Sequence, residues 1–131
     1  MLTRLFSTTK KTGDAAERIA EKYLAAQGLK VMARNYRCRF GEIDLVMQER
    51  ETLVFVEVRL RRTPKGKNGN GGNDFGGAAA SITPTKQARI IAAAQHYLAG
   101  MKQLPPCRFD AILMSAANES SIEWMKGAFE A

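Results

Sequence analysis

The stretch GEIDLVMQERETLVFVEVRLRR, residues 41–62, decides which fold the sequence predicts. Two runs rich in Val, Leu and Ile flank the polar residues ERE, a pattern typical of a β-hairpin. Charged residues interrupt both runs: Asp44 in the first, and Glu57 and Arg59 in the second. An unpaired carboxylate in a protein core is costly, so these charges require a partner or a function.

Side chains alternate between the faces of a strand, which divides the hairpin into an apolar and a charged face. The apolar face of the second strand is expected to hold Val54, Val56, Val58 and Leu60. The first strand is expected to place Glu42, Asp44 and Val46 on one face, with Ile43 and Leu45 opposite. With ERE at the tip, Asp44 lies nearly opposite Glu57, so the charged face carries Asp44, Glu57 and Arg59.

Neighbouring carboxylates repel each other and raise each other's pKa unless a cation or an arginine offsets the charge. Asp44 and Glu57, with a backbone carbonyl oxygen, would make a hard-oxygen site suited to Mg²⁺. Such a cation can orient a water and neutralise charge on a phosphodiester, and Arg59 can hold a phosphate oxygen through two hydrogen bonds. The spacing favours this metal site no more than a solvated face of salt bridges. Glu42 fits an exposed carboxylate better than a third ligand.

The segments on either side of the hairpin predict an α/β domain. Before it, a helix over 14–27 is expected to begin at Thr12 or Asp14 and to end before Gly28, followed by a strand over 29–39. After it come a flexible Gly- and Asn-rich loop over 64–77, a helix over 85–99, and strands over 107–114 and 121–129. This α-β-β-β-α-β-β order predicts a central mixed β-sheet flanked by helices. One domain over 13–131 would follow a flexible basic tail over 1–12.

The chain is basic for its size. Its 131 residues include 20 Lys and Arg against 13 Asp and Glu, which gives a net charge of +7. Such a balance favours a polyanionic partner, most commonly nucleic acid. The candidate phosphate contacts lie at the ends of the hairpin and at the start of the second helix: Arg37, Arg39, Arg61, Arg62 and Lys86. A solvated basic rim, and for Lys86 a plain helix start, are the alternatives.

Other features argue against several classes of protein. No apolar run is long enough to span a membrane, and the N-terminal residues lack the apolar core of a signal peptide. Cys38, Cys107 and His96 are too few to bind zinc, so the cysteines are expected to be free thiols of a cytoplasmic protein. His96 is expected to be a packed or surface histidine rather than a catalyst.

Four stretches taken together resemble the YraN-like family, an uncharacterised family of bacterial proteins. They are GDAAERIAEKYLAAQGLKVMARNYRCRFGEIDLV, LVFVEVRLRR, FGGAAASITPTKQARIIAAAQHYL and CRFDAIL. The family in turn resembles the PD-(D/E)xK nuclease superfamily, close to archaeal Holliday-junction resolvases. The resemblance implies a restriction-endonuclease-like fold, in which a catalytic hairpin belongs to a mixed central sheet flanked by helices.

The resemblance also implies roles for individual residues. Asp44 and Glu57 match the two metal-binding acids of the superfamily motif, and Arg59 stands where the motif has its lysine. Glu17 matches an acid that resolvase-like members place near the metal, with Glu21 as the rival one turn along the helix. Arginine stays protonated and cannot act as a base, although it can still stabilise charge on a phosphate.

The expected function is therefore that of a Mg²⁺-dependent endonuclease that hydrolyses phosphodiesters in branched or structured DNA. The alternative, motivated by Arg59, is a catalytically inactive nuclease-fold module that binds nucleic acid or a protein partner. A basic protein associated with RNA or the ribosome is a third and weaker reading. Junction resolvases act as dimers, so a homodimer is expected by analogy.

Overall fold

The computed structural model describes residues 7–60 and 82–131. Its elements in chain order are α2 (Ser7–Ala26), β1 (Lys30–Cys38), β2 (Gly41–Glu49), β3 (Thr52–Leu60), α4 (Pro84–Leu98), β4 (Cys107–Met114), the short 3-10 helix η2 (Glu119–Ser121) and β5 (Ile122–Phe129). The mixed α/β fold predicted from the sequence is confirmed in its order of helices and strands. The predicted loop over 64–77, with Arg61 and Arg62, lies outside the described residues.

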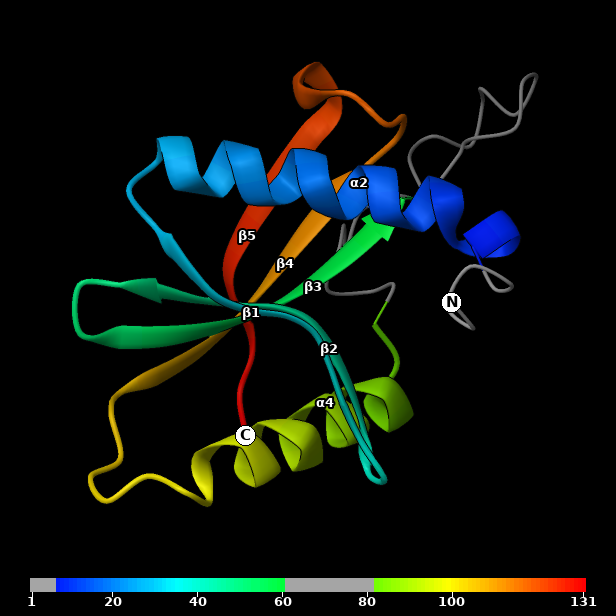
Figure 1. The fold of residues 1–131 in the computed structure, drawn as a ribbon. Helices are drawn as coiled ribbons and strands as arrows, with labels where there is room; N and C mark the ends of the chain where they lie inside the picture. Colours follow the sequence, from blue (N-terminus) through cyan, green and yellow to red (C-terminus); the bar gives the residue numbers. More distant parts are fainter. Residues whose placement is uncertain (1–6, 61–81) are drawn as a thin grey trace.

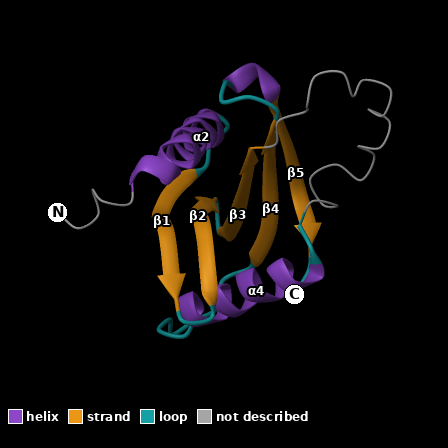
Figure 2. Ribbon diagram, turned by 90° about the vertical axis from the view of Figure 1, so that its right-hand side faces the viewer, coloured by secondary structure: helices purple, strands orange, loops and turns teal. Residues whose placement is uncertain are grey.

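The five strands form one sheet in the order β1-β2-β3-β4-β5. Neighbouring strands are antiparallel except β3 and β4, which are parallel, so the sheet is mixed as predicted. The strands at the two edges, β1 and β5, each pair irregularly with their neighbour, between Val31 and Ala33 and between Phe109 and Ala111. Helix α2 runs across one face of the sheet and α4 across the other (Figures 1 and 2).

Each helix buries an apolar stripe against its own face of the sheet. Ala16, Ala20 and Leu24 of α2 recur at helical spacing and belong to a cluster with strand residues such as Val56. On the other face α4 contributes three residues to a second cluster: Ile90, Ala93 and Ala94. Phe55 of β3 belongs to this second cluster, so both faces of the central strands are covered. No helix among residues 7–60 and 82–131 is long and apolar enough to cross a membrane.

Helix α2 begins earlier than the sequence pattern predicted. It starts at Ser7, so residues 7–12, which were expected to belong to a flexible tail, are helical. Asp14 lies inside the helix, and the prediction of a cap at Thr12 or Asp14 is wrong. Gly13 costs only about 1 kcal/mol in a helix interior, which is small enough for the helix to continue through it.

Helix α4 matches the prediction to within a residue at each end. Thr83 caps it, because the Thr83 hydroxyl accepts a hydrogen bond from the Lys86 backbone N–H at 3.1 Å. Pro84 occupies the first turn, where its missing N–H leaves no bond unmade. This cap holds Lys86 in the first turn of α4.

The β2–β3 hairpin has the predicted register. Glu49 pairs with Thr52 around a turn at Arg50 and Glu51, and Leu45 pairs with Val56. Pairing stops there, although β2 continues back to Gly41 and β3 continues to Leu60. We call this place, where β2 and β3 separate, the fork. The register brings Asp44 and Glu57 to the fork from its two sides.

The predicted division into one apolar and one charged face is wrong for β2. Ile43 and Val46 pack in the cluster beneath α4, whereas Leu45 packs in the cluster beneath α2. Asn35, the β1 residue level with Asp44, has a positive φ of 49°, which bends the paired strands at this point. Both faces of the sheet are therefore apolar, and the charges gather at the bend.

Beyond the bend, β1 and β2 form an arm, residues 36–43, that leaves β3 and packs on α4 (Figure 1). A Cβ atom on Gly41 would lie 2.6 Å from the backbone oxygen of Arg89, so the arm approaches the helix backbone closely. The Tyr36 hydroxyl hydrogen-bonds Nδ1 of His96, and its ring meets Tyr97 edge-on at 5.1 Å. His96 is exposed and has this packing role, as the sequence predicted.

A buried carboxylate that the sequence analysis missed ties β4 to β5. Asp110 is fully buried, and its two oxygens accept hydrogen bonds from Arg108 Nε at 2.8 Å and Nη2 at 2.9 Å. The same oxygens accept bonds from Trp124 Nε1 at 3.0 Å and from the Gly127 N–H at 2.9 Å. Arg108 also reaches Glu49 at 2.8 Å. Cys38 and Cys107 are free thiols, as expected.

Replacing Asp110 by alanine should lower the free energy of unfolding by about 3–5 kcal/mol, because it leaves Arg108 and the Trp124 N–H without their buried acceptor. Urea denaturation measures the loss. Glu49→Ala is the matched control: it removes a partly exposed partner of the same arginine and should cost about 1 kcal/mol or less. Equal losses in the two variants would show that burial of Asp110 is not what matters.

Replacing Gly41 by alanine should destabilise the protein by about 1–3 kcal/mol, since the new methyl group collides with the α4 backbone at Arg89. Gly100→Ala is the control, because a Cβ atom there meets nothing within 4 Å. Thermal melts of both variants test the contact. A Gly41→Ala variant as stable as Gly100→Ala would contradict the packing of the arm on α4.

Candidate active site

Asp44 occupies the fork as a buried carboxylate. Its Oδ2 accepts a hydrogen bond from the Val58 backbone N–H at 2.8 Å, so the side chain takes the place of a sheet hydrogen bond that the parted strands no longer make. Burial raises the pKa of the Asp44 carboxyl, and the bond from Val58 offsets part of that rise. The chain thus places an acid where its geometry is tightly determined.

Glu57 reaches the fork from β3 and is also buried. Burial and the charge of Asp44 raise the pKa of Glu57 to about 7, and Lys86 acts in the opposite direction. Lys86 Nζ lies 3.3 Å from Oε2 of Glu57, closer than Arg59 Nη1 at 3.7 Å. The cation nearest to the second acid therefore comes from α4, and not from the position two residues along β3 that the sequence indicated.

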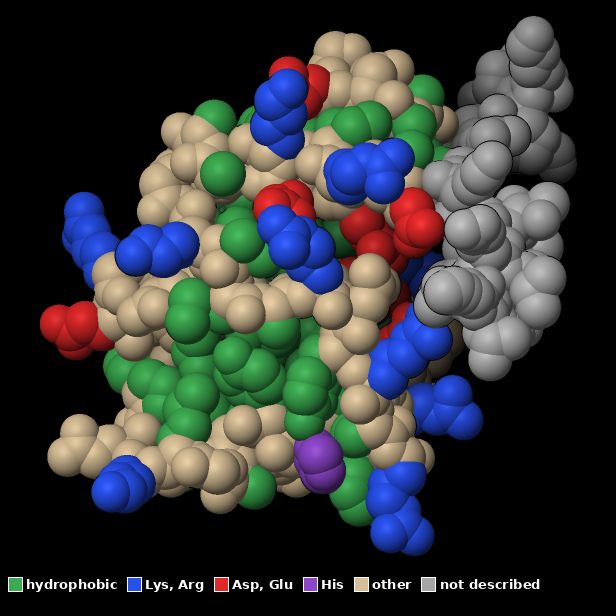
Figure 3. Space-filling view, in the orientation of Figure 1, with side chains coloured by type: hydrophobic (Ala, Val, Ile, Leu, Met, Phe, Trp, Pro, Cys, Tyr) green, Lys and Arg blue, Asp and Glu red, His purple; other side chains and the backbone are tan. Residues whose placement is uncertain are grey.

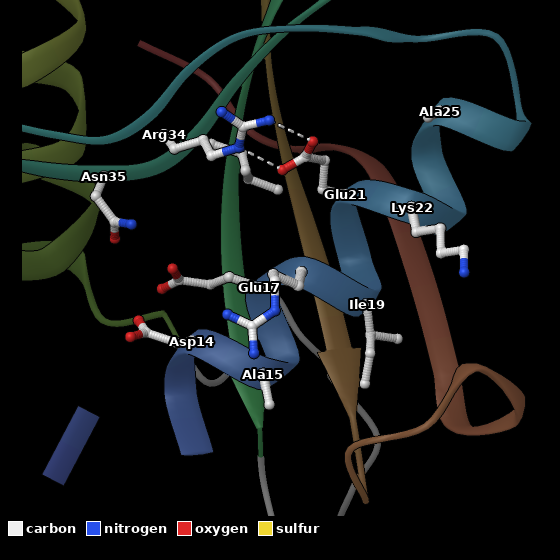
Figure 4. A pocket seen from close by; sticks show the side chains of 11 residues that line it. Asp14, Ala15, Glu17, Ile19, Glu21, Lys22, Ala25, Arg34 and Asn35 are labelled. Carbon is white, nitrogen blue, oxygen red and sulfur yellow. Dashed lines mark hydrogen bonds and ion pairs between the residues drawn. The ribbon is translucent and has the colours of Figure 1, made fainter. Parts of the chain in front are cut away.

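Glu17 approaches the same place from α2. Burial, followed by the charge and hydrogen bonding of Asp44, raises the pKa of Glu17 to about 8. Asp14, one turn earlier on the helix, adds to this rise, while a hydrogen bond with Asn35 lowers it. Figure 4 shows Asp14 and Glu17 directed toward the side on which Asn35 lies, at a pocket of about 970 Å³.

The two rival acids have other partners. Glu21 forms a two-pronged pair with Arg34, at 2.8 Å from Nε and 2.9 Å from Nη2 (Figure 4). Glu42 is exposed and pairs with Arg37 at 3.2 Å. Glu17, and not Glu21, is thus the helix acid that meets Asp44. The prediction that Glu42 is an exposed carboxylate is confirmed.

The acids suit a divalent cation with few protein ligands. Within residues 7–60 and 82–131, no three His, Cys, Asp or Glu side chains form a ready-made metal cage. Asp44 and Glu57 are nevertheless both buried, and the charge of Asp44 raises the pKa of Glu57, so their mutual repulsion disfavours two bare negative charges. Mg²⁺ is commonly held by one or two carboxylates, with water and phosphate oxygens completing its shell.

A second pocket, of about 610 Å³, lies between the arm and the start of α4. Its basic lining residues are Arg37, Arg39, Lys86 and Arg89. We call it the basic pocket. Figure 3 shows acidic side chains grouped beside α2, and basic ones on the same face toward the arm and α4. Lys86 belongs both to this pocket and to the fork, so the two sites adjoin.

The structure thus brings together four of the predicted residues at the fork (Glu17, Asp44, Glu57 and Arg59) and three at the basic pocket (Arg37, Arg39 and Lys86). Arg61 and Arg62 lie outside the described residues. The sequence analysis missed Asp14 beside Glu17, Arg89 in the pocket, and the pairing of Lys86 with Glu57. Arg89 lies three residues after Lys86 in the second helix, a spacing that puts both side chains on one face and was the available signal.

A model of the uncharacterised protein family UPF0102 matches residues 16–114, a span that includes both the fork and the basic pocket. The chain belongs to this family. A UPF0102 protein of Nitrosomonas europaea is 50% identical over 124 residues, covering 95% of this chain and 98% of its own. One from Methylobacillus flagellatus is 52% identical over 122 residues, covering 93% and 99%. One from Ralstonia nicotianae is 55% identical over 120 residues, covering 90% and 85%.

Membership of UPF0102 confirms the family that the sequence motifs predicted. The relatives' names carry no activity, so the resemblance to nucleases stays a prediction. The UPF0102 match ends at residue 114, the last residue of β4, and its span includes the fork residues Glu17, Asp44, Glu57, Arg59 and Lys86.

The raised pKa values make stability depend on pH. Glu17 and Glu57 keep their protons in the folded state up to about pH 8 and 7, whereas the unfolded chain releases them near 4.5. The folded state binds more protons in that window, so the free energy of unfolding should fall as pH rises from about 4.5 to about 8, by on the order of 1–2 kcal/mol after allowing for solvent at Glu17.

Denaturant titrations of metal-free protein between about pH 4.5 and pH 8 measure how the free energy of unfolding depends on pH. The double variant Glu17→Gln, Glu57→Gln should reduce this pH dependence to the part that Asp44 contributes, whereas Glu51→Gln, in the exposed β2–β3 turn, should leave it unchanged. A pH dependence as steep in the double variant as in the wild type would assign the effect to other groups.

Proposed function

We propose that this UPF0102 protein is a Mg²⁺-dependent endonuclease with a restriction-endonuclease-like fold, which hydrolyses phosphodiesters in branched or structured DNA. The observation that carries the proposal is the pair of buried acids at the fork, Asp44 and Glu57, with a lysine ammonium 3.3 Å from Glu57. Buried groups with perturbed pKa values that converge from separate elements are characteristic of catalytic sites.

Asp44 and Glu57 would hold the cation, which supplies Lewis acidity and charge neutralisation at the phosphodiester. The bond from Val58 would keep the Asp44 carboxylate in one orientation, as partners of metal-binding carboxylates commonly do. Glu17 would lie at the edge of the site and accept a hydrogen bond from a bound water.

Lys86 would take the place of the lysine that the motif lacks at Arg59. Its ammonium group lies against Glu57 and can donate a hydrogen bond to the attacking water beside that acid. Arg59 is partly exposed and lies 3.7 Å from Glu57, a position from which its planar guanidinium can hold a phosphate oxygen. An arginine in the motif is therefore compatible with cleavage, because a second element supplies the lysine.

The basic pocket supports DNA as the substrate. Its cations adjoin the acids, so the backbone of a bound strand can continue from one site to the other. The net charge of +7 favours the same partner and makes binding depend on salt. A cytoplasmic homodimer, expected by analogy with junction resolvases, would present two such sites to one branched DNA.

The proposal is tested by incubating a labelled four-way DNA junction with Mg²⁺ and each purified variant. Asp44→Asn and Glu57→Gln, which preserve side-chain shape, should lower the cleavage rate at least about a hundredfold. Lys86→Ala should lower the cleavage rate by about tenfold to a hundredfold relative to the wild type. The loss in Arg59→Ala should be smaller. Glu51→Gln is the control and should cleave at the wild-type rate.

Calorimetric titration of Mg²⁺ provides a readout that does not depend on cleavage. Wild-type protein should show a binding event that Asp44→Asn lacks. Cleavage that persists in both acid variants would refute the proposal. Junction binding that is insensitive to EDTA, without any cleavage or Mg²⁺ binding, would instead identify an inactive nuclease-fold module.

A further inference from the structure

An aromatic ring at the tip of the arm has no role in the core. Phe40 lies in the turn between β1 and β2, and 51% of its surface is exposed. The ring has two neighbours: the Arg39 guanidinium lies over it, 5.7 Å from its centroid, and the centroid of the tilted His96 ring lies 6.0 Å away. An aromatic side chain that is positioned but largely uncovered can receive a flat partner at little further cost in ordering.

Phe40 also lines the basic pocket, together with cations from two elements. Arg39 comes from the arm, and Lys86 and Arg89 come from α4. The acid in the lining is Glu42, and Arg37 pairs with it at 3.2 Å. The pocket therefore combines an exposed aromatic face with several positive charges, the combination that single-stranded nucleic acids recognise.

We propose that the basic pocket binds an unpaired nucleotide of a DNA strand, with its base stacked on Phe40. Arg39 and Arg89 hold the neighbouring phosphates, and Lys86 lies between this nucleotide and the acids of the fork. The inference rests on the proposed function, because it places an unpaired segment of the substrate next to the bond that is cut.

The chemistry of the pocket selects an unpaired strand over a duplex. In a duplex the base faces are stacked on one another, so a side chain on the outside meets only backbone and groove edges. Cations alone would serve duplex binding equally well, whereas Phe40 adds a contact that only an exposed base can make. Branched DNA offers such bases where its strands part.

Binding is measured in EDTA, so that cleavage plays no part, by fluorescence anisotropy with three probes of equal length. They are an oligothymidylate, the same backbone with abasic sites in place of the bases, and a duplex. Phe40→Ala should weaken binding of oligothymidylate by about fivefold to a hundredfold and leave the other two within about twofold. An oligouridylate tests whether RNA is bound equally well.

Two further variants keep the inference testable if Phe40→Ala disturbs the arm. Phe40→Trp preserves the aromatic face: it should bind oligothymidylate as wild type does, and its added fluorescence should be quenched on binding. Leu104→Ala removes another exposed apolar side chain, 71% exposed, and should change nothing.

The inference would be overturned if Phe40→Ala weakened binding of all three probes equally. It would also be overturned if Phe40→Ala had no effect on any probe, and Phe40 would then be available for a protein partner. The proposed nuclease fails separately. If the wild-type protein does not cleave the junction but oligothymidylate binding still depends on Phe40, only the nuclease activity is refuted. If the protein cleaves the junction but oligothymidylate binding does not depend on Phe40, only the nucleotide site is refuted.

Discussion

The hydrogen bond from the Val58 N–H to the Asp44 carboxylate is the interaction on which the arrangement of the site depends. A backbone N–H that loses its sheet partner must find another acceptor, and here a side chain provides it. The Val58 N–H therefore keeps an acceptor where β2 leaves β3, and the arm can then pack on α4. At the same separation Lys86 meets Glu57, and Glu17 approaches Asp44 from α2.

The buried acids of the fork and the buried Asp110 have opposite effects on the stability of the fold. The fork holds acids that repel each other and are only partly offset by Lys86 and Arg59. Asp110, in contrast, is fully buried yet receives four hydrogen bonds within the β4–β5 half of the sheet. A fully satisfied buried carboxylate acts as a structural tie, whereas a crowded and poorly satisfied group is available for chemistry.

The sequence predicted the elements and the pair of acids because periodicity and register are local properties. Alternation along β3 and the ERE turn were enough to place Asp44 level with Glu57. They could not predict the bend at Asn35, since a left-handed backbone conformation in a strand leaves no mark in the hydrophobic pattern. Nor could they pair Lys86 with Glu57, because these residues belong to different elements and lie 29 positions apart in the sequence.

The two edges of the sheet bear on how copies of this protein can associate. An open edge strand can add strands from another molecule, and natural proteins block this with charges and irregular pairing. Both features occur at each edge here: exposed Lys30 and Arg34 on β1, exposed Glu123 and Lys126 on β5, and a register shift in each strand pair. Extension of the sheet by a strand of another molecule is therefore disfavoured at both edges, which limits growth into fibrous aggregates.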